Sequence, residues 1–288
     1  MEYIFHIIIL ISIYGILALA QNLVMGEAGL LAISGAAFYG IGAYVAAIFA
    51  TKLGLSIITT LFIAPIIAGL IALVIGASFA RFRDDYFMLA TLGFLMIFNT
   101  VTKNWEILTN GSYGIPGIPK PQIFGFIFST PLSFVFLSLF LLIIVTIVSE
   151  LIKRSSFGRA LNAIREDEDA LKIFGYQTSR YKLMIFTIGA ALSALGGVLF
   201  ASYITFIDPN LFTVNESILL WAMIVVGGMG QTRGVLLGAL LLIIIPEMLR
   251  FVGFPTEVVG LMRQCIYGLL LVFFMLYRPK GILGIYKL

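Results

Sequence analysis

Residues 131–149 read PLSFVFLSLFLLIIVTIVS, an apolar run without a single Asp, Glu, Lys or Arg. A helix of about 20 residues spans a hydrocarbon core of roughly 30 Å, and this run has that length. Further stretches of similar or greater length also lack charged residues: 3–26, 28–51, 53–80 and 183–207. None alternates apolar and polar side chains in the segments of about ten residues typical of a membrane β-barrel. The sequence therefore predicts an all-α, polytopic transmembrane helical bundle.

We expect about 8–10 spans of this length in a single domain over residues 1–288. The apolar stretches assigned to spans lie near residues 3–24, 30–50, 55–80, 86–102, 131–149, 183–206, 217–232, 234–249 and 264–277. Gly227, Gly228 and Gly230 interrupt one of these stretches, and Pro246 is expected to end another. Broken helices are tolerated at membrane depth only where protein or water covers the exposed backbone.

The composition agrees with a membrane protein and excludes several other classes. Charged residues make up 11% and hydrophobic residues 61% of the chain, whereas soluble domains carry roughly a quarter charged residues. The net charge of +4 is explained by basic cytoplasmic loops and not by nucleic-acid binding, because no basic patch is interleaved with aromatic residues. A single histidine, His6, and a single cysteine, Cys265, cannot build a zinc or haem site.

The largest polar segment, residues 150–182, predicts the orientation. It holds seven basic residues and five acidic ones, and loops rich in Lys and Arg remain in the cytoplasm. Alternating outward from it places the C-terminus on the same side, together with Arg81, Arg83 and Arg233. We therefore expect a multi-pass protein of the plasma (cell) membrane with loop 150–182 and the C-terminus cytoplasmic. The loop 103–130, rich in Gly and Pro, is expected to be extracytoplasmic, either as a turn-rich connector or as a docking surface.

Residues 157–175 read FGRALNAIREDEDALKIFG, and their apolar residues recur at helical spacing. We interpret this segment as an amphipathic cytoplasmic helix, which could lie on lipid or dock into a partner's groove. The acidic run Glu166 to Asp169 would be repelled by anionic lipid. A protein partner is therefore favoured over lipid, and a plain solvated loop is the remaining alternative.

The sequence carries no visible energy source. No stretch matches the phosphate-binding loop G-x-x-x-x-G-K-[ST], and the glycines at 227–230 follow an apolar helix and not a strand. The predicted spans hold no chain of acidic residues of the kind that coupled transporters use; Glu27 comes nearest. They also hold no paired His, Asp or Glu for catalysis. We therefore predict that the chain is not an enzyme, and that it is either a passive channel or a permease driven by a partner.

Several ordered blocks of sequence carry a resemblance to a known family. They are Asn22-Leu23, GEAGLLAISGAAFYGIGAY (26–44), RFRDDYFMLATLGF (81–94), NWEILTNGSYGIPGIPKP (104–121), SSFGRALNAIREDEDALKIFGYQTSRYKL (155–183), VVGGMGQTRGVLLGALLL (225–242) and PEMLR (246–250). In these blocks the chain resembles the permease subunits of ABC importers for branched-chain amino acids, in particular the LivM-type branch. The resemblance covers nearly the whole chain.

The resemblance implies partners and an energy source. Such permeases pair with a second permease subunit and two cytoplasmic ATPase subunits in the lipid bilayer, and an extracytoplasmic substrate-binding protein delivers the substrate. The chain itself would bind no cofactor, because ATP is used by the partner subunits. The implied mechanism is alternating access driven by closure of the ATPase pair.

The resemblance also implies which residues couple to the ATPase. In importer permeases a cytoplasmic loop of the form E-A-A-x-x-x-G docks on the ATPase, and Asp169-Ala170-Leu171 followed by Gly175 is similar to it. Asp replaces the usual Glu, and Leu replaces one Ala. The residues assigned to coupling are Arg165, Glu166, Asp167, Glu168, Asp169, Ala170, Leu171 and Gly175.

The first block supplies candidates for the translocation path. They are Asn22, Gly26, Gly29, Ser34, Gly35, Gly40 and Gly42. The glycines indicate either a broken helix beside the path or close packing without substrate contact. Ala32 to Gly35 lack a polar side chain that many family members place there, and related permeases carry urea or short amides. Because the chain carries no visible energy source, the alternative function is a stand-alone channel or facilitator for a small neutral solute such as urea or a short amide.

Overall fold

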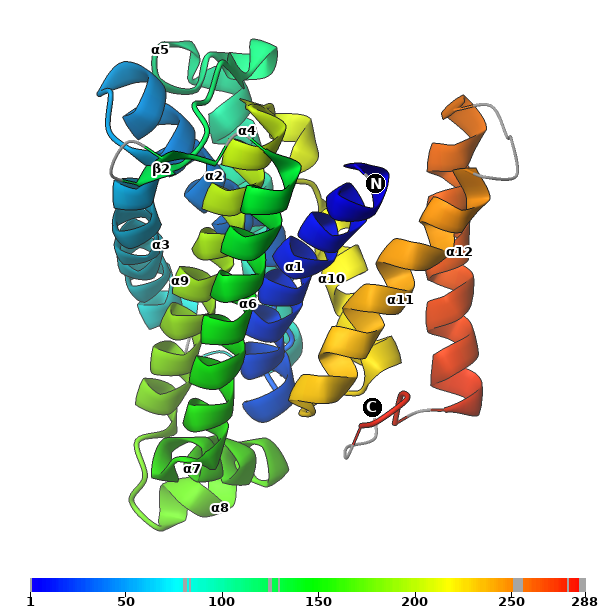
Figure 1. The fold of residues 1–288 in the computed structure, drawn as a ribbon. Helices are drawn as coiled ribbons and strands as arrows, with labels where there is room; N and C mark the ends of the chain where they lie inside the picture. Colours follow the sequence, from blue (N-terminus) through cyan, green and yellow to red (C-terminus); the bar gives the residue numbers. More distant parts are fainter. Residues whose placement is uncertain are drawn as a thin grey trace.

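The computed structural model is a bundle of helices that run between two ends of the molecule (Figure 1). The structure describes residues 2–79, 82, 84–123, 126–128, 130–250, 256–278 and 280–284. Within these residues, six helices are long and apolar enough to cross a membrane. They lie at Glu2–Glu27, Ile57–Phe79, Asp85–Asn104, Pro131–Arg154, Thr178–Ile204 and Pro209–Gly227. The prediction of an all-α polytopic bundle is confirmed.

Each predicted span coincides with one helix of the bundle. These helices are α1 (Glu2–Asn22), α2 (Gly35–Lys52), α3 (Ile57–Phe79), α4 (Asp84–Asn104), α6 (Pro131–Arg154), α9 (Thr178–Ile204), α10 (Val214–Gly227), α11 (Thr232–Arg250) and α12 (Thr256–Tyr277). The predicted stretches 234–249 and 264–277 are extended by their flanks, since α11 and α12 have 19 and 22 residues.

Three boundaries of the predicted spans are wrong. Residues 30–34 are not helical, so the second span begins only at Gly35. Helix α10 ends at Gly227, because Gly228 takes a φ of +112° that ends the helix. Pro246 lies inside α11, which continues to Arg250; within a membrane bundle, neighbouring groups can satisfy the carbonyl that a proline leaves free. Arg81 and Arg83, used in predicting the orientation, lie outside the described residues.

Helix α3 has one face of large apolar side chains and one of small ones. The large, exposed side chains recur every four residues, at Phe62, Ile66, Leu70 and Val74. The opposite face packs against α9 through small buried residues, namely Ala64, Ala68, Ala72 and Gly76. Membrane helices pack through small residues because these let the backbones approach closely. The exposed stripe is therefore suited to contact with lipid.

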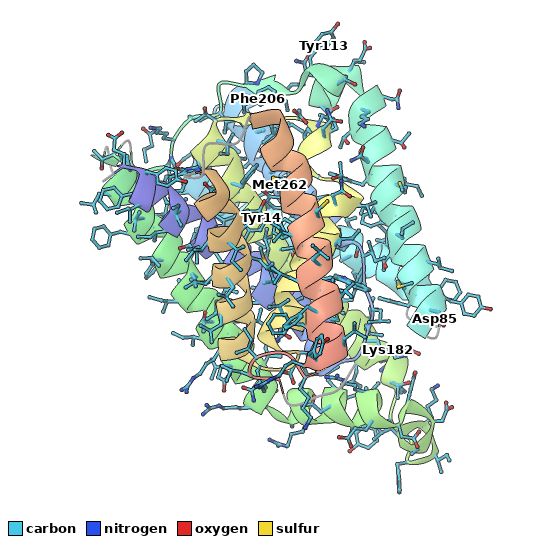
Figure 2. The ribbon with its side chains drawn as sticks, turned by 90° about the vertical axis from the view of Figure 1, so that its right-hand side faces the viewer. Tyr14, Asp85, Tyr113, Lys182, Phe206 and Met262 are labelled. Carbon is cyan, nitrogen blue, oxygen red and sulfur yellow. The ribbon has the colours of Figure 1, made fainter. Side chains whose placement is uncertain are left out.

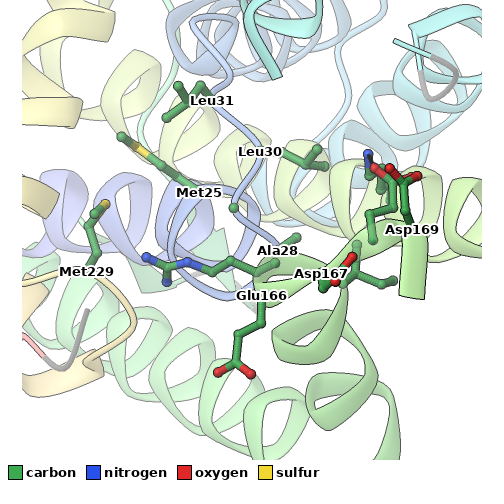
Figure 3. A pocket seen from close by; sticks show the side chains of 13 residues that line it. Met25, Ala28, Leu30, Leu31, Glu166, Asp167, Asp169 and Met229 are labelled. Atoms are coloured by element: carbon green, nitrogen blue, oxygen red, sulfur yellow. Dashed lines mark hydrogen bonds and ion pairs between the residues drawn. The ribbon is translucent and has the colours of Figure 1, made fainter. Parts of the chain in front are cut away.

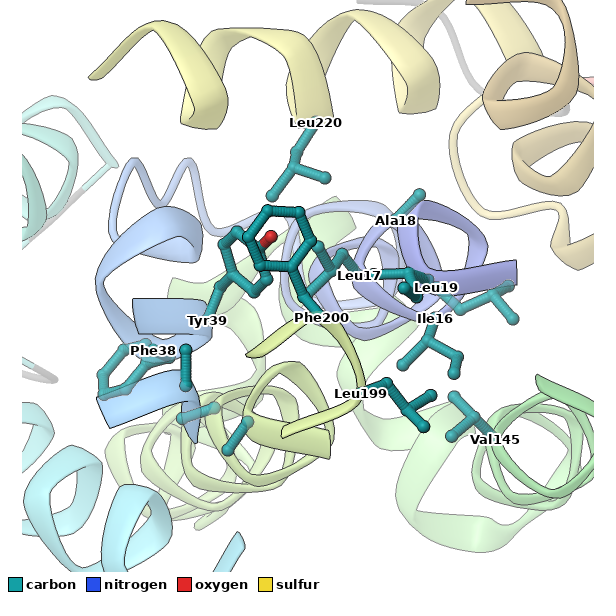
Figure 4. Packing of buried hydrophobic residues seen from close by; sticks show 14 of the residues in the cluster. Ile16, Leu17, Ala18, Leu19, Phe38, Tyr39, Val145, Leu199, Phe200 and Leu220 are labelled. Carbon is teal, nitrogen blue, oxygen red and sulfur yellow. The ribbon is translucent and has the colours of Figure 1, made fainter. Parts of the chain in front are cut away.

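The core of the bundle lies where α2 packs along α9. A Cβ atom on Gly42 would lie 2.2 Å from the Ala194 carbonyl oxygen, and one on Gly197 would lie 2.1 Å from the Tyr39 carbonyl oxygen. Figure 4 shows the Tyr39 ring beside Phe200, between α1, α9 and α10. Glycine is required at both contacts, since any larger residue would push the two backbones apart.

Short elements cover the two ends of the bundle. One end, named here the α5 end, holds α5 (Glu106–Thr109), η2 (Gly111–Tyr113), β1 (Ile115–Pro116), β2 (Gln122–Ile123), β3 (Phe126–Ile127), β4 (Phe206–Ile207) and η3 (Pro209–Leu211). Strand β1 pairs antiparallel with β4, and β2 pairs with β3. The opposite end, the α7 end, holds α7 (Ser156–Glu166) and α8 (Glu168–Ile173). Figure 2 shows Tyr113 at the α5 end and Asp85 and Lys182 at the α7 end.

Candidate functional site

The first two helices of the chain are joined by an interrupted helix at the α7 end. Helix α1 passes into a π-helical turn, η1 (Leu23–Glu27), and residues 28–34 then run without regular helix to the start of α2. Gly29 takes a φ of +70° here, a conformation that favours glycine. We name residues 23–34 the broken segment. Single π-turns in helices occur frequently at functional sites.

Side chains from distant helices satisfy the backbone of the broken segment. The Ala32 carbonyl oxygen accepts hydrogen bonds from Trp221 Nε1 at 2.8 Å and from the Gln21 side chain. The Ile33 amide donates to Thr91 Oγ1 at 3.0 Å. Non-helical backbone is stable inside a membrane protein only when its polar groups are paired in this way. The broken segment is therefore held in place by α1, α4 and α10 together.

A buried ion pair joins the broken segment to α6 and to the turn after α10. Lys153 Nζ lies 3.6 Å from Glu27 Oε1, and the Glu27 side chain is only 2% exposed. Lys153 also donates a hydrogen bond to the Gly230 carbonyl oxygen, and the Gly230 amide donates to Asn22 Oδ1 at 3.0 Å. Asn22, a candidate for the path, thus fixes the turn at 228–231. Glu27 lies between two predicted spans, but the sequence gives no sign that Lys153 is its partner.

The predicted cytoplasmic helix 157–175 is two helices and not one. Asp167, with φ −155° and ψ 97°, separates α7 from α8. Its carboxylate accepts a hydrogen bond from the Ala170 amide at 2.9 Å and so caps α8. Aspartate is among the preferred residues for such an N-cap, which explains why the acidic run interrupts the helix.

Helix α7 contacts the broken segment directly. The Arg165 guanidinium donates to the Gly26 carbonyl oxygen, and a Cβ atom on Gly29 would lie 2.8 Å from Arg165 Cγ. Beside this contact is a hollow of about 550 Å³, shown in Figure 3. The broken segment lines the hollow on one side and the α7–α8 corner lines it on the other, with one residue each from α9 and from the turn after α10. The lining residues are Met25, Ala28, Gly29, Leu30, Leu31, Ile164, Arg165, Glu166, Asp167, Glu168, Asp169, Lys182 and Met229.

The acidic run divides into tethering and exposed residues. Glu168 binds Lys182 Nζ at 2.5 Å and Thr178 Oγ1 at 2.9 Å, and the Lys182 side chain is only 3% exposed. Of the residues assigned to coupling, Glu168 therefore fixes α8 to the start of α9. Glu166 is exposed, and Asp169 is exposed while pairing with Lys172 at 3.1 Å.

Acidification is expected to release α8 from α9. Burial acts to raise the pKa of Glu168, but the hydrogen bonds from Lys182 and Thr178 outweigh it and leave the pKa below the ordinary value of 4.5. The tether therefore contributes its full stability above the ordinary pKa of 4.5, and this stability is lost as the pH falls through the lowered pKa. Hydrogen–deuterium exchange of the α8 amides, corrected for intrinsic rates, should accelerate as the pH falls below 4.5 and through the lowered pKa. A Glu168→Gln variant should show the faster exchange already at neutral pH; pH-independent exchange in the native chain would contradict the tether.

The tip beyond α8 exposes apolar side chains. Ile173 is 86% and Phe174 79% exposed, and Tyr176 is also exposed. Gly175 takes a φ of +84°, and no atom lies within 4 Å of the position of a Cβ atom there. The sequence assigns Gly175 to coupling but not Ile173, which the structure shows to be exposed. We name Glu166, Asp169, Ile173 and Phe174 the α8 tip.

The glycine candidates in α2 and η1 are closely packed. A Cβ atom on Gly26 would lie 2.2 Å from Asn22 Oδ1, and one on Gly40 would lie 2.6 Å from the Phe98 ring. Gly35 begins α2, directly after the buried Ser34. For Gly26, Gly40 and Gly42 these distances favour packing over substrate contact, whereas Gly29 lines the hollow.

Comparisons with known proteins agree over nearly the whole chain. A family model described as the permease component of the branched-chain amino acid transport system matches residues 3–275. The chain is 36% identical to the high-affinity branched-chain amino acid transport system permease protein LivM of Escherichia coli, over 95% of this chain and 68% of that protein. Identity to the probable LivM of Methanocaldococcus jannaschii is 30%, over 77% and 68% of the two chains.

A second group of relatives is more distant. The permease protein LivH of Salmonella typhimurium is 25% identical, over 99% of this chain and 95% of that protein. No solved structure gives a significant match.

Proposed function

Because the chain belongs to the family of branched-chain amino acid transport permease components, we propose that it is the membrane-spanning permease subunit of an ATP-driven importer for branched-chain amino acids. The family is one of transport permeases, which is not a class of enzymes. The apolar helices and the relatives make the chain a multi-pass membrane protein. Residues 1–288 would act as one permease domain.

The partners follow from the kind of subunit. A second permease, of this type or of the related LivH type, would complete the pathway, and two ATPase subunits would bind at the α7 end. The excess of basic residues in loop 150–182 supports a cytoplasmic position for this end. The α5 end would then face outward and receive substrate from a binding protein, and its exposed Ile107 and Tyr113 are available for that contact.

One observation carries the proposal: the α7–α8 unit is exposed on one side and bonded to the broken segment on the other. The α8 tip presents two acidic and two apolar side chains to a partner. On its inner side the unit reaches the Gly26 carbonyl through Arg165. Movement of a docked ATPase would therefore be transmitted through α7 to the non-helical backbone between α1 and α2, which changes shape more readily than a continuous helix. This is a route for ATP-driven alternating access.

The α8 tip is expected to be required for ATPase binding. Two variants test this surface: one carries Glu166→Lys and Asp169→Lys, and the other carries Phe174→Asp. In each, the amount of ATPase that purifies with the chain should fall at least about tenfold, because docking surfaces depend on a few central residues. The measurement is affinity purification of the tagged chain from its native membrane in mild detergent, with quantification of ATPase subunits. Lys103→Glu is a matched charge reversal at an exposed position of the α5 end and should leave ATPase recovery unchanged.

The alternative function is tested in the same preparation. Native ATPase recovery by both α8-tip variants would contradict the docking surface. A native chain that recovers no ATPase, and passes urea or leucine into liposomes without ATP, would favour the stand-alone facilitator. Glu168→Lys is not used here, because Glu168 is bonded internally to Lys182 and its loss would disturb the fold of the loop.

A further inference from the structure

A half-buried carboxylate of α10 lies between α1 and α10, away from both ends of the bundle. Glu216 is in the first turn of α10 and within the apolar stretch Pro209–Gly227. The next residue, Ser217, accepts a hydrogen bond from the Ala36 amide at 3.1 Å, so this turn lies at the same depth as the start of α2. The predicted span 217–232 left Glu216 just outside the membrane. An ionisable residue within a membrane bundle marks a candidate functional site, because placing it there is costly.

Helix α1 supplies the first partner of this carboxylate. The Tyr14 hydroxyl donates to Glu216 Oε2 at 3.1 Å. Tyr14 lies midway along the stretch from Glu2 to Glu27, and Figure 2 shows it between the end that carries Tyr113 and the end that carries Lys182. The pair is therefore near the middle of the bundle, the depth at which transporters commonly bind their substrates.

A second tyrosine lies beside the pair with an unused hydroxyl. Tyr39 is only 1% exposed, and its hydroxyl has no hydrogen-bond partner among the described residues. The ring is fixed edge-on against Phe200 and Phe212, with centroids 5.3 and 4.9 Å away. Tyr39 lies one turn after Ala36, whose amide donates to Ser217 beside Glu216, so α2 brings Tyr39 next to the first turn of α10. A buried polar group without a partner is uncommon and requires an explanation.

We propose that Glu216, Tyr14 and Tyr39 bind the ammonium group of the transported amino acid midway through the bundle. This inference rests on the proposed function and names the residues that recognise its substrate. A carboxylate and two hydroxyl oxygens can accept hydrogen bonds from the three N–H groups of a primary ammonium. Charge-assisted hydrogen bonds of this kind are stronger than those between neutral groups. The neighbouring Phe200, Phe212 and Leu220 are apolar and suit an aliphatic side chain.

A similar pair elsewhere in the chain provides a control. The Tyr3 hydroxyl donates to Glu247 Oε2 at 2.6 Å, also between α1 and a later helix, but near the start of α1. Both pairs join a tyrosine hydroxyl to a glutamate carboxylate. Among the described residues, the Tyr3–Glu247 pair has no counterpart of Tyr39, a buried tyrosine whose hydroxyl lacks a partner. If carboxylate–tyrosine pairs only tie α1 to its neighbours, both pairs should behave alike on substitution.

The test measures equilibrium binding of radiolabelled leucine to the purified full chain in lipid nanodiscs, without ATPase. The native chain should bind leucine at millimolar or lower concentrations. 3-Methylbutan-1-amine, which keeps the ammonium group, should compete, and 4-methylpentanoate, which lacks it, should compete at least about tenfold less well. Glu216→Gln should weaken leucine binding at least about tenfold, and Glu247→Gln should leave it unchanged.

Tyr39→Phe separates recognition from structure. It removes only a hydroxyl that has no protein partner, so the unfolding temperature should be unchanged or higher while leucine binding weakens several-fold. Native leucine affinity in Tyr39→Phe, equal losses in Glu216→Gln and Glu247→Gln, or no leucine binding by the native chain would each overturn the inference. Because this assay contains no ATPase, the recovery of ATPase subunits described above tests the proposed function separately.

Discussion

Replacing Gly197 with alanine is expected to destabilise the bundle by at least about 2 kcal/mol, because the added methyl group has no room. A Cβ atom there would lie 2.1 Å from the Tyr39 carbonyl oxygen and 2.7 Å from the Ala43 amide nitrogen. Both obstacles are backbone atoms of α2, and α2 is buried on nearly all sides. The helix cannot shift without disturbing its contacts with α1, α3 and α10, so the strain cannot be relieved by a side-chain rotation.

Gly69→Ala is the matched control for this substitution. Gly69 also faces α9, but a Cβ atom there would meet Thr187 Cγ2 at 3.6 Å, an ordinary contact. Because alanine favours a helix over glycine by up to about 1 kcal/mol, this variant should be neutral or more stable. The measurement is the unfolding temperature of each variant in the same lipid nanodiscs. Equal unfolding temperatures for Gly197→Ala and the native chain would show that α2 and α9 do not approach so closely.

The fold class could be predicted because charge is a local signal. A stretch without charged residues and long enough to span the membrane is read directly from the chain, and every such stretch contains a long helix. The broken segment could not be predicted in this way. Residues 28–34 contain neither proline nor charge, and their backbone is held open by Trp221 and Thr91 from distant helices. Long-range hydrogen bonds of this kind leave no pattern in the local sequence.

The acidic run illustrates what the sequence could and could not assign. Four adjacent carboxylates predicted a protein partner, and the resemblance placed coupling among them. Which carboxylates face inward depends on Lys182, fourteen residues after Glu168 and on another helix. Capping by Asp167 was open to prediction, since an aspartate before a short apolar repeat is a signal for a helix start. The continuous apolar periodicity on either side obscured it.

Removing the charge of Lys153 alone is expected to destabilise the chain by about 3–5 kcal/mol, the cost of removing one partner of a buried ion pair. In Lys153→Met the Glu27 carboxylate, 2% exposed, loses its ion-pair partner, and the Gly230 carbonyl loses a donor. Both losses fall where the broken segment meets α6 and the turn after α10. We therefore expect this variant to expose the broken segment to hydrogen exchange as well as to lower the unfolding temperature.

Two further variants decide whether the buried charge causes the loss. The double variant Glu27→Gln, Lys153→Met removes both charges and should recover most of the stability, because replacing a whole buried pair is often neutral. Arg154→Met removes the neighbouring charge, but Arg154 is 78% exposed and pairs with Glu150 at the surface; its effect should stay below about 1 kcal/mol. If the double variant is as unstable as Lys153→Met, the loss comes from Lys153 packing and its hydrogen bond to Gly230. Recovery would instead mean that the Glu27 charge left without Lys153, where the broken segment meets α6, causes the loss.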